Sequence, residues 1–90
     1  MGKGTWPAIW MMGTDINNVG WPRCGEIDIM EYVGYQPGVF HFTLHGTKNG
    51  KYTRTEGKNF STTAPEEGFA VFAIEWDEAG IRYFIDNTLV

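Results

Sequence analysis

Three acidic residues lie within a six-residue stretch of an otherwise apolar segment: Glu26, Asp28 and Glu31. Successive side chains of a β-strand point to opposite faces, so Glu26 and Asp28 share one face. Strict alternation would turn Glu31 to the other face, where an unpaired carboxylate in a core is costly. One extra residue near Ile29 and Met30, a β-bulge, would return Glu31 to the face of the other two acids. The segment therefore predicts a bulged strand with three carboxylates on one surface, which is suited to acid–base chemistry.

Close carboxylates restrict one another's ionisation, and at least one of the three is expected to have a raised pKa. The ordinary alternative is a strand with solvated acids, but the need for a bulge and the flanking Trp21 and Tyr32 favour a functional role. A calcium site is a second alternative. It is disfavoured because calcium prefers six to eight oxygen ligands and a regular strand offers too few. The sequence therefore predicts neither a metal site nor a cofactor.

The segment from Gly25 to Glu31, Gly-Glu-Ile-Asp-Ile-Met-Glu, resembles the catalytic signature of glycoside hydrolase family 16. Its bulged form is typical of the laminarinase-like members, endo-1,3-beta-glucanases that cut β-1,3-glucan. Other segments resemble the same family, and together they cover nearly the whole chain: residues 4–12, 21–24, 43–46, 69–76 and 81–90. The resemblance implies an all-β fold, a concanavalin A-like jelly-roll β-sandwich of antiparallel strands. Residues 1–90 are then expected to be the central part of a single catalytic domain, an internal fragment whose bare strand edges would promote aggregation.

The resemblance also implies roles for the acids. Glu26 would be the nucleophile and Glu31 the general acid/base, with Asp28 between them and hydrogen-bonded to Glu26. A retaining glycosidase holds its two carboxyl groups about 5–5.5 Å apart. Alternate residues on one strand face are separated by about 6.5–7 Å along the chain, so one bulged strand could present both.

The implied function is therefore retaining, endo-acting hydrolysis of β-1,3-glucan, with a polysaccharide as the partner. Two alternatives stay open. One is a non-catalytic β-glucan-binding module on the same fold, which is disfavoured because such relatives typically lack the acids. The other is a hydrolase or transglycosylase acting on another polysaccharide, such as mixed-linkage glucan or agarose.

Five residues near the acids are candidates for binding substrate: Trp6, Trp10, Trp21, Arg23 and His45. Trp6 and Trp10 share one face of a predicted strand, and Trp21 ends a loop, where its flat ring could stack on a sugar. Arg23 could hydrogen-bond a sugar hydroxyl or pair with a carboxylate. His45 lies on the polar face of a predicted strand and could assist the acids, or could make a purely structural hydrogen bond.

Period-2 alternation and turn residues predict the elements that position these side chains. Residues 13–22 are predicted to be a loop, and residues 47–67 a polar surface excursion with one short strand at 52–54. The other predicted strands are 5–12, 25–33, 39–46, 68–76 and 81–86.

The composition is that of a globular domain, with 42% hydrophobic and 20% charged residues. The net charge of −4 argues against a nucleic-acid partner. Cys24 is the single cysteine and cannot form an internal disulfide. No segment is apolar enough to span a membrane, and residues 1–4 lack the apolar core of a signal peptide. An extracellular location is expected from the resemblance alone.

Overall fold

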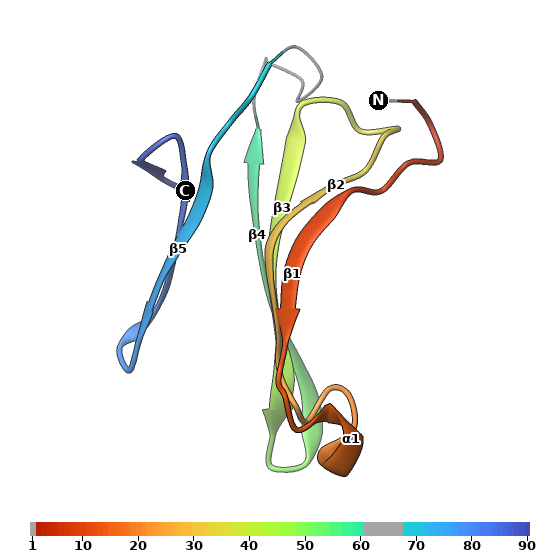
Figure 1. Ribbon diagram of the computed structural model, residues 1–90, viewed down its shortest axis with the longest axis vertical. Helices are drawn as coiled ribbons and strands as arrows, with labels where there is room; N and C mark the ends of the chain where they lie inside the picture. Colours follow the sequence, from red (N-terminus) through yellow and green to blue (C-terminus); the bar gives the residue numbers. More distant parts are fainter. Residues whose placement is uncertain (1, 61–67) are drawn as a thin grey trace.

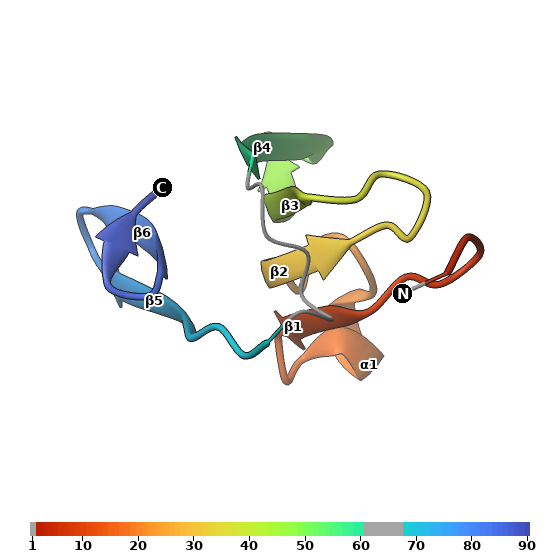
Figure 2. The same ribbon diagram turned by 90° about the horizontal axis from the view of Figure 1, so that it is seen from above.

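The computed structural model describes residues 2–60 and 68–90, which form two antiparallel sheets in two layers (Figures 1 and 2). The larger sheet has the order β1-β2-β3-β4, with β1 at Ala8–Met12, β2 at Glu26–Tyr32, β3 at Val39–Lys48 and β4 at Lys51–Phe60. The smaller has the order β5-β6-β7, with β5 at Phe72–Asp77, β6 at Gly80–Ile85 and β7 at Thr88–Leu89. In the described residues the one helix is α1, Ile16–Val19. The predicted all-β, antiparallel class is confirmed.

The hydrophobic core lies between the two sheets. From β2 and β3 it takes Met30, Tyr32, Phe40 and Phe42, and the second sheet covers these with Phe72, Tyr83 and Ile85. Aromatic rings bridge the layers, since Phe40 lies 5.3 Å from Phe72 and Phe42 lies 5.5 Å from Tyr83, centroid to centroid. Burial of each large side chain contributes about 1.5–3 kcal/mol. The apolar side chains that alternate along β3 therefore hold the sheets together, and the polar side chains between them lie on the opposite face.

The predicted bulge is present in β2. Asp28 pairs with Thr43 of β3 and Glu31 pairs with His41, so two residues of β2 oppose one residue of β3. The pairing with β1 shifts at the same place. Met30 is consequently turned into the core, where it is 8% exposed, while Glu31 stays on the face of the other acids.

The prediction for residues 47–67 is only partly right for the part that the structure describes, because the predicted strand at 52–54 is present but is much longer. Residues 51–60 form one long strand, β4, which pairs with β3 along its whole length. The turn is Asn49-Gly50, with φ of 53° and 75°, a pair that favours a two-residue hairpin. Its sequence resembles that of a polar loop because the strand lies at the edge of the sheet and carries Thr and charged side chains. The rest of the segment, residues 61–67, lies outside the described residues.

Other boundaries differ slightly. The first strand begins at Ala8, not residue 5, although the Pro7 carbonyl still accepts a hydrogen bond from the Tyr32 N–H at 3.0 Å. Pro7 itself has no N–H to donate to a ladder. The predicted strand 39–46 extends to Lys48, and the predicted strand 68–76 begins at Phe72. In the described residues no helix is long and apolar enough to cross a bilayer.

Candidate active site

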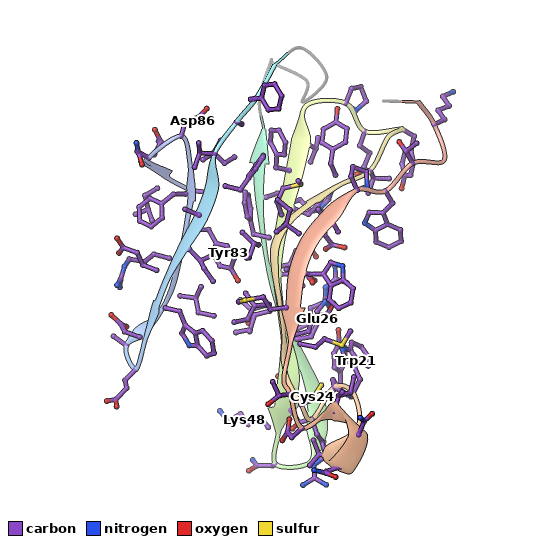
Figure 3. The ribbon with its side chains drawn as sticks, viewed as in Figure 1. Trp21, Cys24, Glu26, Lys48, Tyr83 and Asp86 are labelled. Carbon is purple, nitrogen blue, oxygen red and sulfur yellow. The ribbon has the colours of Figure 1, made fainter. Side chains whose placement is uncertain are left out.

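The three acids of β2 lie on the face of the large sheet that points away from the second sheet. Figure 3 shows Glu26 on this side of the sheet, near Trp21, with Tyr83 on the opposite side between the layers. Each acid stands in a row across the strands, because paired residues share a face. The rows are Met12–Glu26–His45–Arg54, Trp10–Asp28–Thr43–Glu56 and Ala8–Glu31–His41–Lys58. Strands β2, β3 and β4 thus form a floor of polar side chains around Asp28, and β1 borders it with Met12, Trp10 and Ala8.

Asp28 is the most enclosed of the three acids, at 3% exposure. One carboxylate oxygen, Oδ2, lies 3.0 Å from Nε2 of His45. The pKa of Asp28 is raised to about 7, chiefly by burial, and hydrogen bonding to Glu26 and the charge of Glu31 contribute to this rise. The expected pKa rise among the three acids is confirmed, and it falls on Asp28. At mildly acidic pH this carboxyl group holds a proton between the two glutamates.

Two tryptophans donate hydrogen bonds to the outer acids. The indole Nε1–H of Trp21 donates to Oε2 of Glu26 at 2.7 Å, and that of Trp6 donates to Oε1 of Glu31 at 3.1 Å. Both rings are well exposed, at 48% and 67% respectively. Each ring therefore fixes one glutamate by its N–H and still offers a flat apolar surface to solvent.

The loop that carries Trp21 is closed at its base by two glycines. The Gly13 N–H donates to the Gly25 carbonyl at 3.0 Å, and a side chain at Gly13 would overlap the carbonyl oxygen of Cys24. Gly25 has a φ of 80°, which an L side chain rarely adopts. This closure places Trp21 beside the first residue of β2, Glu26.

The sequence profile described as "Glycosyl hydrolases family 16" matches residues 1–90, the whole chain. The chain belongs to glycoside hydrolase family 16. The family membership that the segment around Glu26 predicted is confirmed.

The curated relatives match the chain over almost its whole length, but the chain spans only a third or less of their own length. A beta-glucanase from Rhodothermus marinus is 44% identical over 98% of the chain, which covers 32% of that protein. A keratan-sulfate endo-1,4-beta-galactosidase from Sphingobacterium multivorum is 35% identical over 98% of the chain, which covers 21% of that protein.

Among solved structures, the laminarinase catalytic domain from Thermotoga maritima is 41% identical, with a TM-score of 0.81 over 99% of the chain and 37% of that structure. The predicted jelly-roll sandwich is therefore confirmed for this family 16 chain.

A hollow of about 220 Å³ lies beside Glu31. Its wall includes Trp6, and its polar lining includes His41, Gln36 and Arg54. The His41 ring nitrogens lie 3.1 Å from Gln36 Oε1 and 3.3 Å from Oε1 of Glu56. Aromatic side chains combined with a few hydrogen-bonding groups are the usual lining of small-molecule sites.

The other predicted binding residues differ in their placement. Trp10 pairs directly with Asp28 across β1 and β2 and is 52% exposed, so it lies on the same face as the acids. His45 contacts Asp28 and lies under Trp21, with ring centroids 5.6 Å apart. Arg23 is exposed and, within residues 2–60 and 68–90, forms no hydrogen bond with an acid. Its role stays a prediction.

Three residues of this face could hold a metal ion, because ligand atoms of Glu26, Asp28 and His45 all lie within 4.8 Å of one another. Two carboxylates and an imidazole are a donor set for a divalent transition metal rather than for calcium. The hydrogen bond between Asp28 and His45 accounts for much of this closeness. The absence of a metal stays a prediction.

Sequence reasoning missed the contribution of β4 to this face. Tyr52 Oη lies 2.7 Å from Nδ1 of His45, and Glu56 bridges His41 and Arg54. The Asn49-Gly50 dipeptide was the available signal. It predicts a two-residue hairpin, and alternation from Lys51 onward then places Tyr52, Arg54 and Glu56 on one face.

Proposed function

We propose that this chain forms the catalytic centre of a retaining, endo-acting β-1,3-glucanase. The observation that carries the proposal is the bulge in β2, which puts Glu26 and Glu31 on one face on either side of a protonatable Asp28. A single regular strand could not present all three. In this proposal residues 1–90 are the central part of the catalytic domain, and the protein acts outside the cell.

The first half of the reaction requires an acid and a nucleophile at one glycosidic bond. The Glu26 carboxylate, held by the Trp21 N–H, attacks the anomeric carbon and forms a glycosyl ester. The Glu31 carboxyl group gives its proton to the leaving oxygen at the same time. Negative charge thereby moves from Glu26 to Glu31. The polysaccharide is cut, and its glycosyl part stays covalently bound to Glu26.

The second half reverses these roles. Glu31, now ionised, takes a proton from a water molecule, which attacks the anomeric carbon and releases Glu26 as a carboxylate. Two inversions give net retention at that carbon. A sugar hydroxyl in place of water would give transglycosylation by the same steps. Asp28 shares its proton with whichever glutamate is ionised, which spreads the charge at each stage.

The substrate class rests on the relatives' names. A beta-glucanase and a laminarinase are among the similar proteins, and this supports β-1,3-glucan. The galactosidase that acts on keratan sulfate shows that the family also includes other specificities. The rate of cleavage of laminarin is therefore to be compared with the rates for mixed-linkage glucan and agarose.

The test is the release of reducing ends by the full-length protein from laminarin, mixed-linkage β-glucan and agarose. Laminarin is expected to be cut fastest and to give a series of short oligosaccharides from the start, as an endo-acting enzyme does. Faster release from either other polymer would contradict the β-1,3 assignment. Retardation of the folded protein in a laminarin gel without any release would instead indicate a binding module.

A further inference from the structure

We propose that Tyr52 is a positioning residue that fixes His45 as the tautomer with its proton on Nε2, directed at Asp28. This inference rests on the proposed function, because it assigns Tyr52 a part in the same acid cluster. Tyr52 touches none of the three acids by a hydrogen bond in the described residues. Its effect reaches them through the imidazole.

Both ring nitrogens of His45 are engaged. Nδ1 lies 2.7 Å from the hydroxyl oxygen of Tyr52, and Nε2 lies 3.0 Å from Oδ2 of Asp28. A neutral imidazole has one N–H donor and one acceptor nitrogen, and the partner of one nitrogen decides the state of the other. If Tyr52 donates its hydroxyl proton to Nδ1, Nε2 must be the donor to Asp28.

Charge favours this direction. Asp28 is in contact with Glu26 and with Glu31, so the cluster carries negative charge whenever either glutamate is ionised. An N–H dipole pointing at such a cluster is stabilised, and a bare nitrogen lone pair there is repelled. A phenol hydroxyl rotates about its C–O bond, so Tyr52 can direct its proton at Nδ1, which lies 2.7 Å from the hydroxyl oxygen.

The tautomer decides where the proton of Asp28 can go. With Nε2–H donating to Oδ2, the carboxyl proton of Asp28 is left on the side of the glutamates. In the other tautomer the Nε2 lone pair would accept that proton, and Asp28 would be a donor to histidine instead. The Tyr52 hydroxyl therefore keeps the Asp28 proton available to Glu26 and Glu31.

Ring packing holds the three aromatic groups in place. Tyr52 stacks on His45 with 15° between the ring planes and lies 5.6 Å from Trp21, centroid to centroid. Trp21 in turn donates to Glu26. Tyr52→Phe is thus a selective change, because it removes the hydroxyl and keeps the ring that supports His45 and Trp21.

The first measurement is the tautomer of His45 by ¹⁵N chemical shifts in the full-length protein labelled at histidine, with the signal assigned by its loss in His45→Gln. We expect a protonated Nε2 and an unprotonated Nδ1 in the parent. In Tyr52→Phe we expect a mixture of both tautomers. A proton on Nδ1 in the parent would overturn the inference.

The second measurement is the kinetics of Tyr52→Phe on laminarin. The turnover number kcat is expected to fall roughly 2–10-fold, the range for loss of one hydrogen bond, while KM stays within about twofold. Tyr83→Phe is the matched control, since Tyr83 packs on Phe42 between the sheets, and it should leave kcat unchanged. An unchanged kcat or an unchanged tautomer in Tyr52→Phe would contradict the role. An inactive parent would refute the proposed function, and the tautomer measurement would still decide the hydrogen bonding of His45.

Discussion

Glu26→Gln is expected to reduce hydrolysis of laminarin by roughly 10⁴-fold or more, the scale of loss when a hydrolase loses its covalent nucleophile. Glutamine keeps the size of the side chain and an oxygen that can accept the Trp21 N–H, so the loop around Trp21 should stay in place. What it lacks is the negative charge that attacks the anomeric carbon. The measurement is kcat on laminarin, with the melting temperature of each protein as the check on folding.

Glu78→Gln is the matched control for this change. Glu78 is exposed in the turn between β5 and β6, on the sheet that does not carry the acids. The control variant should retain full activity. A Glu26→Gln protein that melts normally and keeps more than a tenth of the parental rate would remove Glu26 from the proposed mechanism.

Glu31→Ala is expected to have an effect that depends on the leaving group. On laminarin, kcat should fall roughly 10²–10⁴-fold, the usual contribution of general acid–base catalysis. On an aryl glucoside with a dinitrophenolate leaving group, formation of the glycosyl ester should be nearly unaffected, because that leaving group departs without a proton. Hydrolysis of the ester is then slow, and added azide should accelerate turnover and give a β-glycosyl azide.

The control here is Glu78→Ala, which should show no azide effect. Ester formation on the aryl glucoside, measured as the first-turnover release of dinitrophenolate, that falls as much as kcat on laminarin would contradict an acid role for Glu31. So would an α-glycosyl azide, because azide attack on a covalent α-ester must give the β product.

The bulged strand β2 could be predicted in detail from the sequence, because the spacing of its acids constrains its geometry. Glu31 could avoid the core only with an extra residue near Ile29, and the β-bulge of β2 lies there. The clean alternation of residues 39–46 likewise predicted which face of β3 is buried. In both cases the burial cost of a polar side chain is large enough to dominate local preferences.

The edge strand β4 could not be recognised by the same argument. Its residues are polar on both faces, so hydrophobic periodicity gives no signal, and its order comes from backbone pairing with β3. As a result Tyr52 and Glu56, which contact His45 and His41, had no predicted role. The hydrogen bonds from Trp21 to Glu26 and from Trp6 to Glu31 could not be predicted from the sequence either, because they depend on how two loops fold back on the sheet.

The most direct measurement is mass spectrometry of the full-length protein after reaction with an activated 2-deoxy-2-fluoro β-laminaribioside. The fluorine slows hydrolysis of the glycosyl ester, so a retaining enzyme accumulates it. We predict that the peptide containing Glu26 gains the mass of one fluorinated disaccharide, with the modification on the Glu26 carboxylate. No adduct on a protein that cuts laminarin, or an adduct on Glu31, would contradict the double displacement through Glu26.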